Sequence, residues 1–329
     1  MKKIIIAGGL FTIILILFIS ALFATDFKGA MDIVMKLSPW LVVAFLILSI
    51  INFALYTLRW DIIAHAGRER VADFRSMMGI RFVTYAIGYL LPSAQIGGEP
   101  VRMYFLEKRG FQRKEALSSV IIDKVFETAI VVIFSVIAFV LVIFYAQGVP
   151  TEIYSFFMLF FILLLFFAYF YYTIVKDGFF TFIFQVLHLK NIRFLAPFEE
   201  KIMSMEALMK KFFHHHVKEL LWTISLTMLT YIIFLLEYYL LFYALGVRAT
   251  FGQLIVVSTI PLISYLIPIP GAAGALELSQ YLSLSLAKMD PNLAFPIMVM
   301  IRLRDLIFII AGLVYGSSHG VKLLSKSSH

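Results

Sequence analysis

The chain alternates between long apolar segments and short polar loops. A helix that spans the hydrocarbon core of a bilayer needs about 20 mostly apolar residues. The segments that meet this length are Ile4–Ala24, Pro39–Leu58, Ser119–Ala146, Ile153–Val175, Leu220–Leu245 and Leu293–Tyr315. The pattern therefore predicts an all-α polytopic membrane protein with about six spanning helices.

The first apolar segment has a second interpretation as a signal peptide, because Lys2 and Lys3 precede it. The run from Ile4 to Ala24 is longer than the about 7–15 residues of a signal-peptide core, and its end is a poor cleavage site. We therefore expect this segment to remain as the first spanning helix.

Two further apolar segments are too short to span and end in proline and glycine. Arg81–Pro92 leads into Gly97 and Gly98, and Leu254–Ile267 leads into Pro270. Non-helical backbone at membrane depth is tolerated only where protein or water satisfies its polar groups. We predict two re-entrant helical hairpins that meet in the protein interior, with ordinary kinked helices as the alternative.

The basic residues support this topology, because short loops rich in Lys and Arg face the cytoplasm. Basic residues on both sides of the first short segment belong on that side: Arg59, Arg68, Arg70, Arg75 and Arg81 before it, and Arg102, Lys108, Arg109, Arg113 and Lys114 after it. Loop Gln147–Glu152 lacks Lys and Arg and faces outward, whereas Lys176–Lys218 is basic and faces inward. Both termini are then cytoplasmic.

This order divides the chain into two halves of opposite orientation, residues 1–146 and 147–329. Each half reads span, span, hairpin, span. In many transporters, inverted halves with interrupted helices in matching positions form a binding site near the bilayer midplane. The order therefore predicts a single transmembrane domain of transporter type in the cell membrane.

Composition agrees with a membrane protein. The 329 residues are 62% hydrophobic and 15% charged, with a mean hydropathy of +0.95, whereas a soluble domain has about 25% charged residues. The net charge of +8 comes from residues in loops between apolar segments, so we expect no nucleic-acid partner. Absence of cysteine excludes disulfides and thiolate metal sites.

The hairpin turns combine glycine, proline and one acid each. Glycine lets the backbone turn and approach a ligand closely, and a following helix N-terminus attracts phosphate. The candidate substrate-binding residues in these turns are Gly97, Gly98, Glu99 and Arg102 in the first hairpin and Pro270, Gly271, Gly274 and Glu277 in the second.

A basic residue follows each acid by 25 positions: Lys124 follows Glu99, and Arg302 follows Glu277. Ionisable groups within spanning helices are costly and are functional candidates. The further substrate-binding candidates are Asp123, Lys124, Glu127, Arg302, Arg304 and Asp305. Alternatively, Glu99–Lys124 and Glu277–Arg302 are ion pairs that lock the hairpins to the spans, and both roles can coexist.

Two acidic features have open interpretations. Asp123 and Glu127 share a helix face, which permits acid–base or metal chemistry, although Lys124 and Arg102 can also neutralise them. Glu237 lies within a predicted span beside tyrosines. It either faces a cavity and couples to protons or forms a hydrogen bond with a tyrosine.

Other polar features indicate membrane-surface roles. Arg59–Trp60 ends a span and is typical of an interfacial anchor. The segment near residues 190–216 has apolar residues at helical spacing, which predicts an amphipathic helix on the anionic cytoplasmic leaflet. Adjacent histidines, His214–His216, point in different directions on a helix and favour the surface over a metal site.

One ordered set of residues covers nearly the whole chain: Pro92, Gly97–Glu99, Arg102, Gly110, Ala116, Ser119, Asp123–Lys124, Pro268, Pro270–Gly271, Gly274, Glu277 and Arg302. This set resembles the lysylphosphatidylglycerol synthase transmembrane-region family of flippase-like membrane proteins. Asp123–Lys124 departs from the family's usual Asp-Arg, and Ala272–Ala273 replaces a more glycine-rich turn. These departures weaken Lys124 as a bidentate phosphate ligand but keep its charge.

The resemblance implies translocation of an anionic, aminoacylated or isoprenoid-linked lipid headgroup by alternating access. Larger family members join this region to a soluble aminoacyltransferase domain, for which we expect no room here, so we expect no enzyme, catalytic residue, metal or cofactor. The expected partners are a phospholipid or lipid-linked substrate, with a homo-oligomer or a lipid-synthesis enzyme as further possibilities. The alternatives are a membrane-embedded lipid-modifying enzyme that uses Asp123 and Glu127, or a scaffold subunit.

Overall fold

The computed structural model describes residues 37–145 and 199–326, together with single positions between them. All regular structure in these ranges is helical, as predicted. The predicted spans Ile4–Ala24 and Ile153–Val175 lie outside the described residues.

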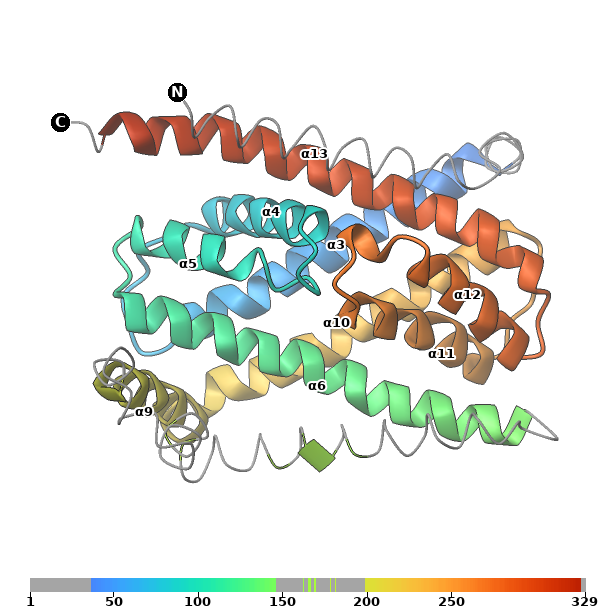
Figure 1. Cartoon of the computed structure of the whole chain (residues 1–329), viewed down its shortest axis with the longest axis horizontal. Helices are drawn as coiled ribbons and strands as arrows, with labels where there is room; N and C mark the ends of the chain where they lie inside the picture. Colours follow the sequence, from blue (N-terminus) through green and yellow to red (C-terminus); the bar gives the residue numbers. More distant parts are fainter. Residues whose placement is uncertain are drawn as a thin grey trace.

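Three helices of the described ranges are long and apolar enough to cross a membrane: α3 (Pro39–Ala64), α6 (Arg113–Tyr145) and α10 (Val217–Ala244). They agree in length and composition with three of the predicted spans. Together with α13 (Ala294–Lys326), they run along the long axis of the molecule (Figure 1). The predicted span Leu293–Tyr315 falls within α13, and its crossing of the membrane stays a prediction.

The first hairpin consists of α4 (Phe74–Leu90) and α5 (Glu99–Glu107), joined by a turn. Helix α4 begins at Phe74, before the predicted start of the apolar segment at Arg81. Its added turns include Met77 and Ile80, which are fully buried in a cluster with Trp60 of α3 and Leu106 of α5. Burial of this apolar face stabilises the extra turns of helix.

The turn of the first hairpin lies close against α4. A Cβ atom at Gly98 would lie 2.1 Å from the carbonyl oxygen of Thr84. Ala94 and Gln95 have positive φ angles of 50° and 61°, a conformation in which ordinary residues are strained. The turn therefore depends on glycine at position 98 and on a tight reversal before it.

The second hairpin consists of α11 (Phe251–Thr259), the 3₁₀ segments η3 (Ile260–Leu266) and η4 (Pro270–Ala272), and α12 (Ala275–Leu286). The α-helix ends near Pro261, which has no N–H to donate to the carbonyl of Val257. The side-chain amide of Gln280 on α12 donates to that carbonyl at 3.2 Å. A residue of the returning helix thus replaces the missing bond.

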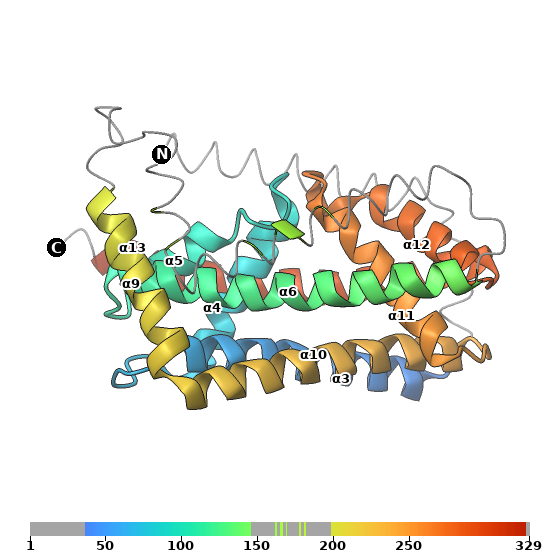
Figure 2. The ribbon, with the colours of Figure 1, turned by 90° about the horizontal axis from the view of Figure 1, so that it is seen from below.

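The two hairpins meet tip to tip in the middle of the molecule, as Figures 1 and 2 both show. The ring of Tyr89 at the end of α4 lies on Gly271 in η4, where an added Cβ atom would approach the ring to 2.4 Å. The prediction that the hairpins meet in the interior is confirmed by this contact.

Long helices hold the hairpins from two sides. Helix α13 lies along α4, and a Cβ atom at Gly312 would lie 2.2 Å from the carbonyl oxygen of Phe82. Helix α10 lies beside α3 (Figure 2). Close packing at Gly312 lets the backbones of α4 and α13 approach each other.

Helix α9 (Glu199–His215) corrects the expectation of a helix lying on the leaflet. Met205, Met209 and Phe212 on its apolar face are buried against Ile63 of α3 and Ile122 of α6. These side chains contact protein, so they are not available to lipid. The exposed His214 and His215 agree with the predicted surface position.

Candidate functional site

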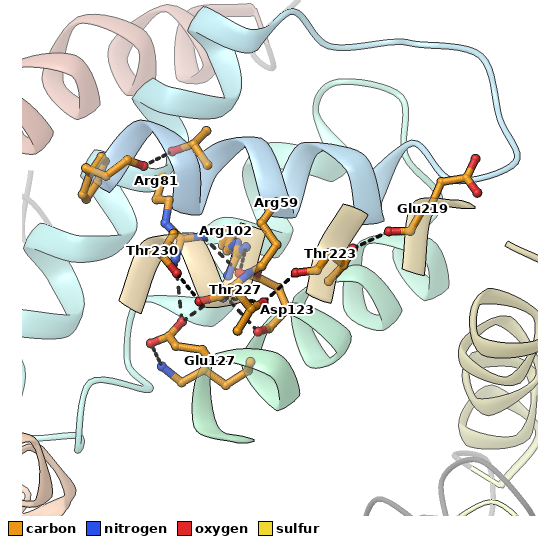
Figure 3. A network of polar contacts seen from close by, with 12 residues as sticks. Arg59, Arg81, Arg102, Asp123, Glu127, Glu219, Thr223, Thr227 and Thr230 are labelled. Atoms are coloured by element: carbon orange, nitrogen blue, oxygen red, sulfur yellow. Dashed lines mark hydrogen bonds and ion pairs between the residues drawn. The ribbon is translucent and has the colours of Figure 1, made fainter. Parts of the chain in front are cut away.

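A carboxylate that is fully buried on α6 gathers three arginines from three other elements. Asp123 accepts hydrogen bonds from Arg59 Nε of α3 at 2.8 Å, Arg81 Nη1 of α4 at 3.0 Å and Arg102 Nη2 of α5 at 2.5 Å. Figure 3 shows the three side chains converging on it. The first hairpin is thereby joined to both neighbouring long helices.

Further contacts hold the arginines in place. The guanidinium of Arg102 stacks 3.8 Å from the centroid of the Trp60 ring, a cation–π contact that is strong when desolvated. Arg102 also donates to Glu99 at 3.2 Å. Arg59 donates to Thr227 of α10 at 3.4 Å (Figure 3). Five helices, α3, α4, α5, α6 and α10, therefore contribute to one polar centre.

A second carboxylate completes this centre on the same helix. Glu127 accepts from Lys124 at 2.9 Å and lies 3.7 Å from Arg81 and 3.9 Å from Arg59. We call the whole group the Asp123 cluster, comprising Arg59, Arg81, Glu99, Arg102, Asp123, Lys124 and Glu127. It contains four basic and three acidic side chains, so it carries one surplus positive charge.

The second hairpin is joined to α13 by a different charge group. Arg302 donates through Nε and Nη2 to Glu277 at 2.9 and 2.5 Å, and through Nη1 to the Gly271 carbonyl at 2.7 Å. Its Nη1 also donates to the Tyr89 hydroxyl. Arg302 therefore binds both hairpin tips at once.

Arg304 lies two residues after Arg302 on α13 and donates hydrogen bonds to two acids. It donates to Glu237 of α10 at 3.1 Å and to Oδ1 of Asp305 at 2.8 and 3.0 Å. Asn52 of α3 donates to Glu237 at 3.2 Å, and Tyr85 of α4 donates to Asp305 Oδ1 at 2.8 Å. We call Glu237, Glu277, Arg302, Arg304 and Asp305 the Arg304 cluster. Three acids and two arginines leave it one surplus negative charge.

One face of α4 connects the two clusters. Arg81, Tyr85 and Tyr89 are spaced four residues apart and therefore lie on the same side of the helix. Arg81 bonds Asp123, whereas Tyr85 and Tyr89 bond Asp305 and Arg302. A displacement of α4 would alter both clusters.

The structure brings all of the predicted charged residues into these two clusters and places the predicted small residues beside them. Gly97 and Gly98 lie in the first turn, Pro270 and Gly271 form η4, and Gly274 precedes α12, where its N–H donates to Glu277 at 2.8 Å. The predicted Glu277–Arg302 ion pair is confirmed. The predicted Glu99–Lys124 pair is wrong, because these residues bond Arg102 and Glu127 respectively.

Two arginines that the sequence placed in a cytoplasmic loop belong to the site. Arg59 and Trp60 are fully buried, so the expectation of an interfacial anchor is wrong. Arg81 lies inside α4, with its side chain only 12% exposed. The only signal in the sequence was an arginine within one turn of an apolar segment, which is equally typical of a membrane interface.

Glu237 accepts hydrogen bonds from Arg304 and Asn52 rather than from a tyrosine. Among the described residues, no three His, Cys, Asp or Glu side chains converge as a metal site. Asp123 is held by three arginines, which stabilise its ionised form and make it a poor general base.

Comparisons with known proteins agree with this architecture. The sequence profile of the lysylphosphatidylglycerol synthase TM region matches residues 4–312. A UPF0104 membrane protein of Methanothermobacter thermautotrophicus is 26% identical over 316 residues, which cover 90% of this chain and 91% of that protein. No solved structure matches the chain. The similarity therefore extends over nearly the full length of a multi-pass membrane protein.

Proposed function

We propose that this chain, which belongs to the lysylphosphatidylglycerol synthase TM-region family, moves an anionic lipid headgroup across the cell membrane while the lipid tails remain in the bilayer. The headgroup is aminoacylated, isoprenoid-linked or a simple phospholipid.

The surplus positive charge of the Asp123 cluster is the observation that supports the proposal best. Ionisable groups buried within membrane helices are expensive unless a partner neutralises them. Four basic groups face three carboxylates here, and Arg102 Nε is buried without a hydrogen-bond partner. A phosphate would supply the missing negative charge and accept that N–H.

In the proposed mechanism, the basic side chains exchange carboxylate partners for the headgroup phosphate, and no new charge is created. A headgroup phosphate enters beside Lys124, whose side chain is 31% exposed, and takes guanidinium contacts from the Asp123 cluster. Arginine forks bind phosphate oxygens in pairs. Glu99 and Glu277 then balance the released cations, and Arg302 and Arg304 receive the phosphate as the site opens to the other side.

Alternating access follows from two inverted halves, residues 1–146 and 147–329, each with three spans and one re-entrant hairpin. The hairpin tips meet at Tyr89 and Gly271, beside Arg302 of the Arg304 cluster. Rocking of one half against the other separates these tips in one direction at a time. Both termini are cytoplasmic in this topology, as the basic loops predict.

The test is reconstitution of the purified protein in liposomes that contain fluorescent phosphatidylglycerol or fluorescent phosphatidylcholine. Movement between leaflets is followed by quenching of the outer leaflet. We expect protein-dependent movement of phosphatidylglycerol, lost in Lys124→Ala and in Arg302→Ala. Lys114→Ala is the matched control, because Lys114 is an exposed lysine on the same helix as Lys124.

Each other outcome identifies a different function. A chemically altered lipid recovered after incubation would indicate a lipid-modifying enzyme. Folded protein that moves neither lipid would indicate a scaffold subunit. Normal movement in both cluster variants would contradict the proposed site while leaving transport in place.

A further inference from the structure

The Arg304 cluster lacks one positive charge, the opposite of the Asp123 cluster. Its three carboxylates face two arginines among the described residues. Two of its buried acceptor atoms, Asp305 Oδ2 and Asn52 Oδ1, have no hydrogen-bond partner. A buried carboxylate without a counter-ion is costly. One bound cation would neutralise the cluster, so that its arginines could then accept an anion.

We propose that Glu237 binds one proton when an anionic headgroup occupies the Asp123 cluster, so that lipid and proton cross the membrane together. This inference rests on the proposed function, because the headgroup is the anion that binds the Asp123 cluster. The proton balance is simple: the Glu237 carboxylate takes a proton from water on one side and releases it to water on the other.

The other two carboxylates of the cluster have more charged donors. Glu277 accepts two N–H groups from Arg302 and one from the Gly274 backbone. Asp305 Oδ1 accepts two N–H groups from Arg304. Each of these two carboxylates therefore receives at least two charged N–H donors.

Glu237 receives the weakest support from charged donors. Its contacts are one N–H of Arg304 at 3.1 Å and the neutral amide of Asn52 at 3.2 Å. Arg304 divides its five donors between Glu237 and Asp305 and lies nearer to Asp305. Glu237 is 2% exposed. Deep burial and few charged donors both favour the neutral acid.

Asn52 can serve both states of Glu237. Its amide nitrogen donates to the carboxylate, and its oxygen is buried and unpaired. Rotation of the amide by half a turn would present the oxygen as an acceptor for the O–H of the neutral acid. The orphan oxygen thus gains a partner when the proton binds.

A proton fits this site better than a metal ion. A metal requires several oxygen ligands around one point, and no such group of acidic or histidine side chains exists among the described residues. The titratable and charged neighbours of Glu237 and its cluster come from several elements: Arg302, Arg304 and Asp305 of α13, Tyr238 of α10, Tyr85 and Tyr89 of α4, Tyr265 of η3 and Glu277 of α12. The tyrosines are neutral donors, so the proton is the missing positive charge.

Electrostatics couples the two clusters. Arg81 and Tyr89, which contact Asp123 and Arg302, are separated by about 12 Å of helix rise on α4, and we take a separation of this order for Glu237. At an effective dielectric constant of about 20, opposite unit charges at that distance change proton affinity about tenfold. A headgroup that cancels the surplus positive charge of the Asp123 cluster thereby favours proton binding at Glu237. Linkage requires that the proton favour headgroup binding equally.

The experiment uses liposomes with fluorescent phosphatidylglycerol, which carries one negative charge, and an imposed pH difference. Symport of one proton per lipid predicts that phosphatidylglycerol accumulates in the leaflet that faces the higher pH. The ratio of the lipid between the two leaflets should be about tenfold per pH unit. The charges cancel, so a clamped membrane potential should not change this ratio. Glu237→Gln should abolish the accumulation, whereas Glu219→Gln on the same helix should retain it.

The outcomes separate the two proposals. Lipid movement that ignores the pH difference in the unmodified protein would overturn the coupling and leave the transport function intact. No lipid movement would overturn both. If lipid movement in Glu237→Gln depended on the pH difference as strongly as in the unmodified protein, the proton would bind to a residue other than Glu237.

A spectroscopic measurement tests the proton site without transport. Infrared difference spectra of the protein in a maltoside detergent, recorded as the pH falls, should show a carboxylic-acid band that Glu237→Gln removes. Glu277→Gln and Glu219→Gln should keep that band. Its persistence in Glu237→Gln would overturn the assignment even if transport were lost through misfolding.

Discussion

In the Asp123 cluster three arginines share one carboxylate, whereas in the Arg304 cluster two arginines divide three carboxylates between them. Each cluster joins one helical hairpin to the neighbouring long helices. The first is short of negative charge and the second is short of positive charge.

This difference shows that two similar hairpins can hold clusters of opposite net charge. The first cluster draws its cations from α3, α4, α5 and α6 onto Asp123, and the second carboxylates of its arginines are more distant: 3.2 Å from Arg102, 3.7 Å from Arg81 and 3.9 Å from Arg59. The second distributes its contacts, so that loss of one acid leaves each arginine with another acceptor. Sensitivity to substitution should differ accordingly.

Asp123→Ala should have the largest effect. It leaves Arg59, Arg81 and Arg102 buried around an empty position, and removal of one partner of a buried pair costs about 3–5 kcal/mol. We expect loss of folded protein, measured as yield and thermal unfolding in detergent. Asp305→Ala is the comparison, with a smaller loss because Arg304 keeps Glu237. Equal losses would contradict the difference between the clusters.

Gly98→Ala should be the next most damaging change. The new Cβ atom would lie 2.1 Å from the Thr84 carbonyl oxygen, so backbone must move. Overpacking of this kind costs about 1–3 kcal/mol. Gly316→Ala in α13 is the control, because its nearest neighbour lies at an ordinary 3.4 Å. The thermal unfolding temperature should fall for Gly98→Ala alone, and a fall of similar size in both variants would refute the steric explanation.

The hairpins could be predicted because their signals are local. Proline and glycine that end a short apolar run, as at Pro92–Gly98, report helix interruption directly. The Glu277–Arg302 pair was also within reach, because Glu277 is the one acidic residue of the second hairpin and Arg302 follows it by 25 positions. Local chemistry thus predicted the turns and one of the ion pairs.

The arginines around Asp123 were not predictable in the same way. Arg59 lies 64 positions from its partner, and an arginine at the end of an apolar run is typical of a membrane interface. Only the tertiary packing of α3 on α6 shows that the position is buried. The same holds for α9, whose periodicity predicts an apolar face but not whether protein or lipid covers it.

Tyr89→Phe should loosen the contact between the hairpin tips. It removes the hydroxyl to which Arg302 donates while the ring remains on Gly271. A single intramolecular hydrogen bond contributes about 0.5–1.5 kcal/mol, so the thermal unfolding temperature should fall slightly. Tyr281→Phe, at an exposed tyrosine of α12, should leave it unchanged. An unchanged Tyr89→Phe would mean that the hydroxyl does not hold the tips together.

Lys124→Gln should have the smallest effect on stability and a large effect on transport. Lys124 is 31% exposed and pairs with Glu127, which retains contacts with Arg81 and Arg59. Partly exposed pairs contribute about 0–1 kcal/mol, so the unfolding temperature should hardly change. A lost charged contact with phosphate, about 1.5–3 kcal/mol, should slow phosphatidylglycerol movement at least about tenfold. Lys124→Arg should preserve the movement, because it keeps the charge. If Lys124→Gln lowered stability and movement together and Lys124→Arg rescued neither, the residue would serve the fold alone, and headgroup entry would have to occur elsewhere in the Asp123 cluster.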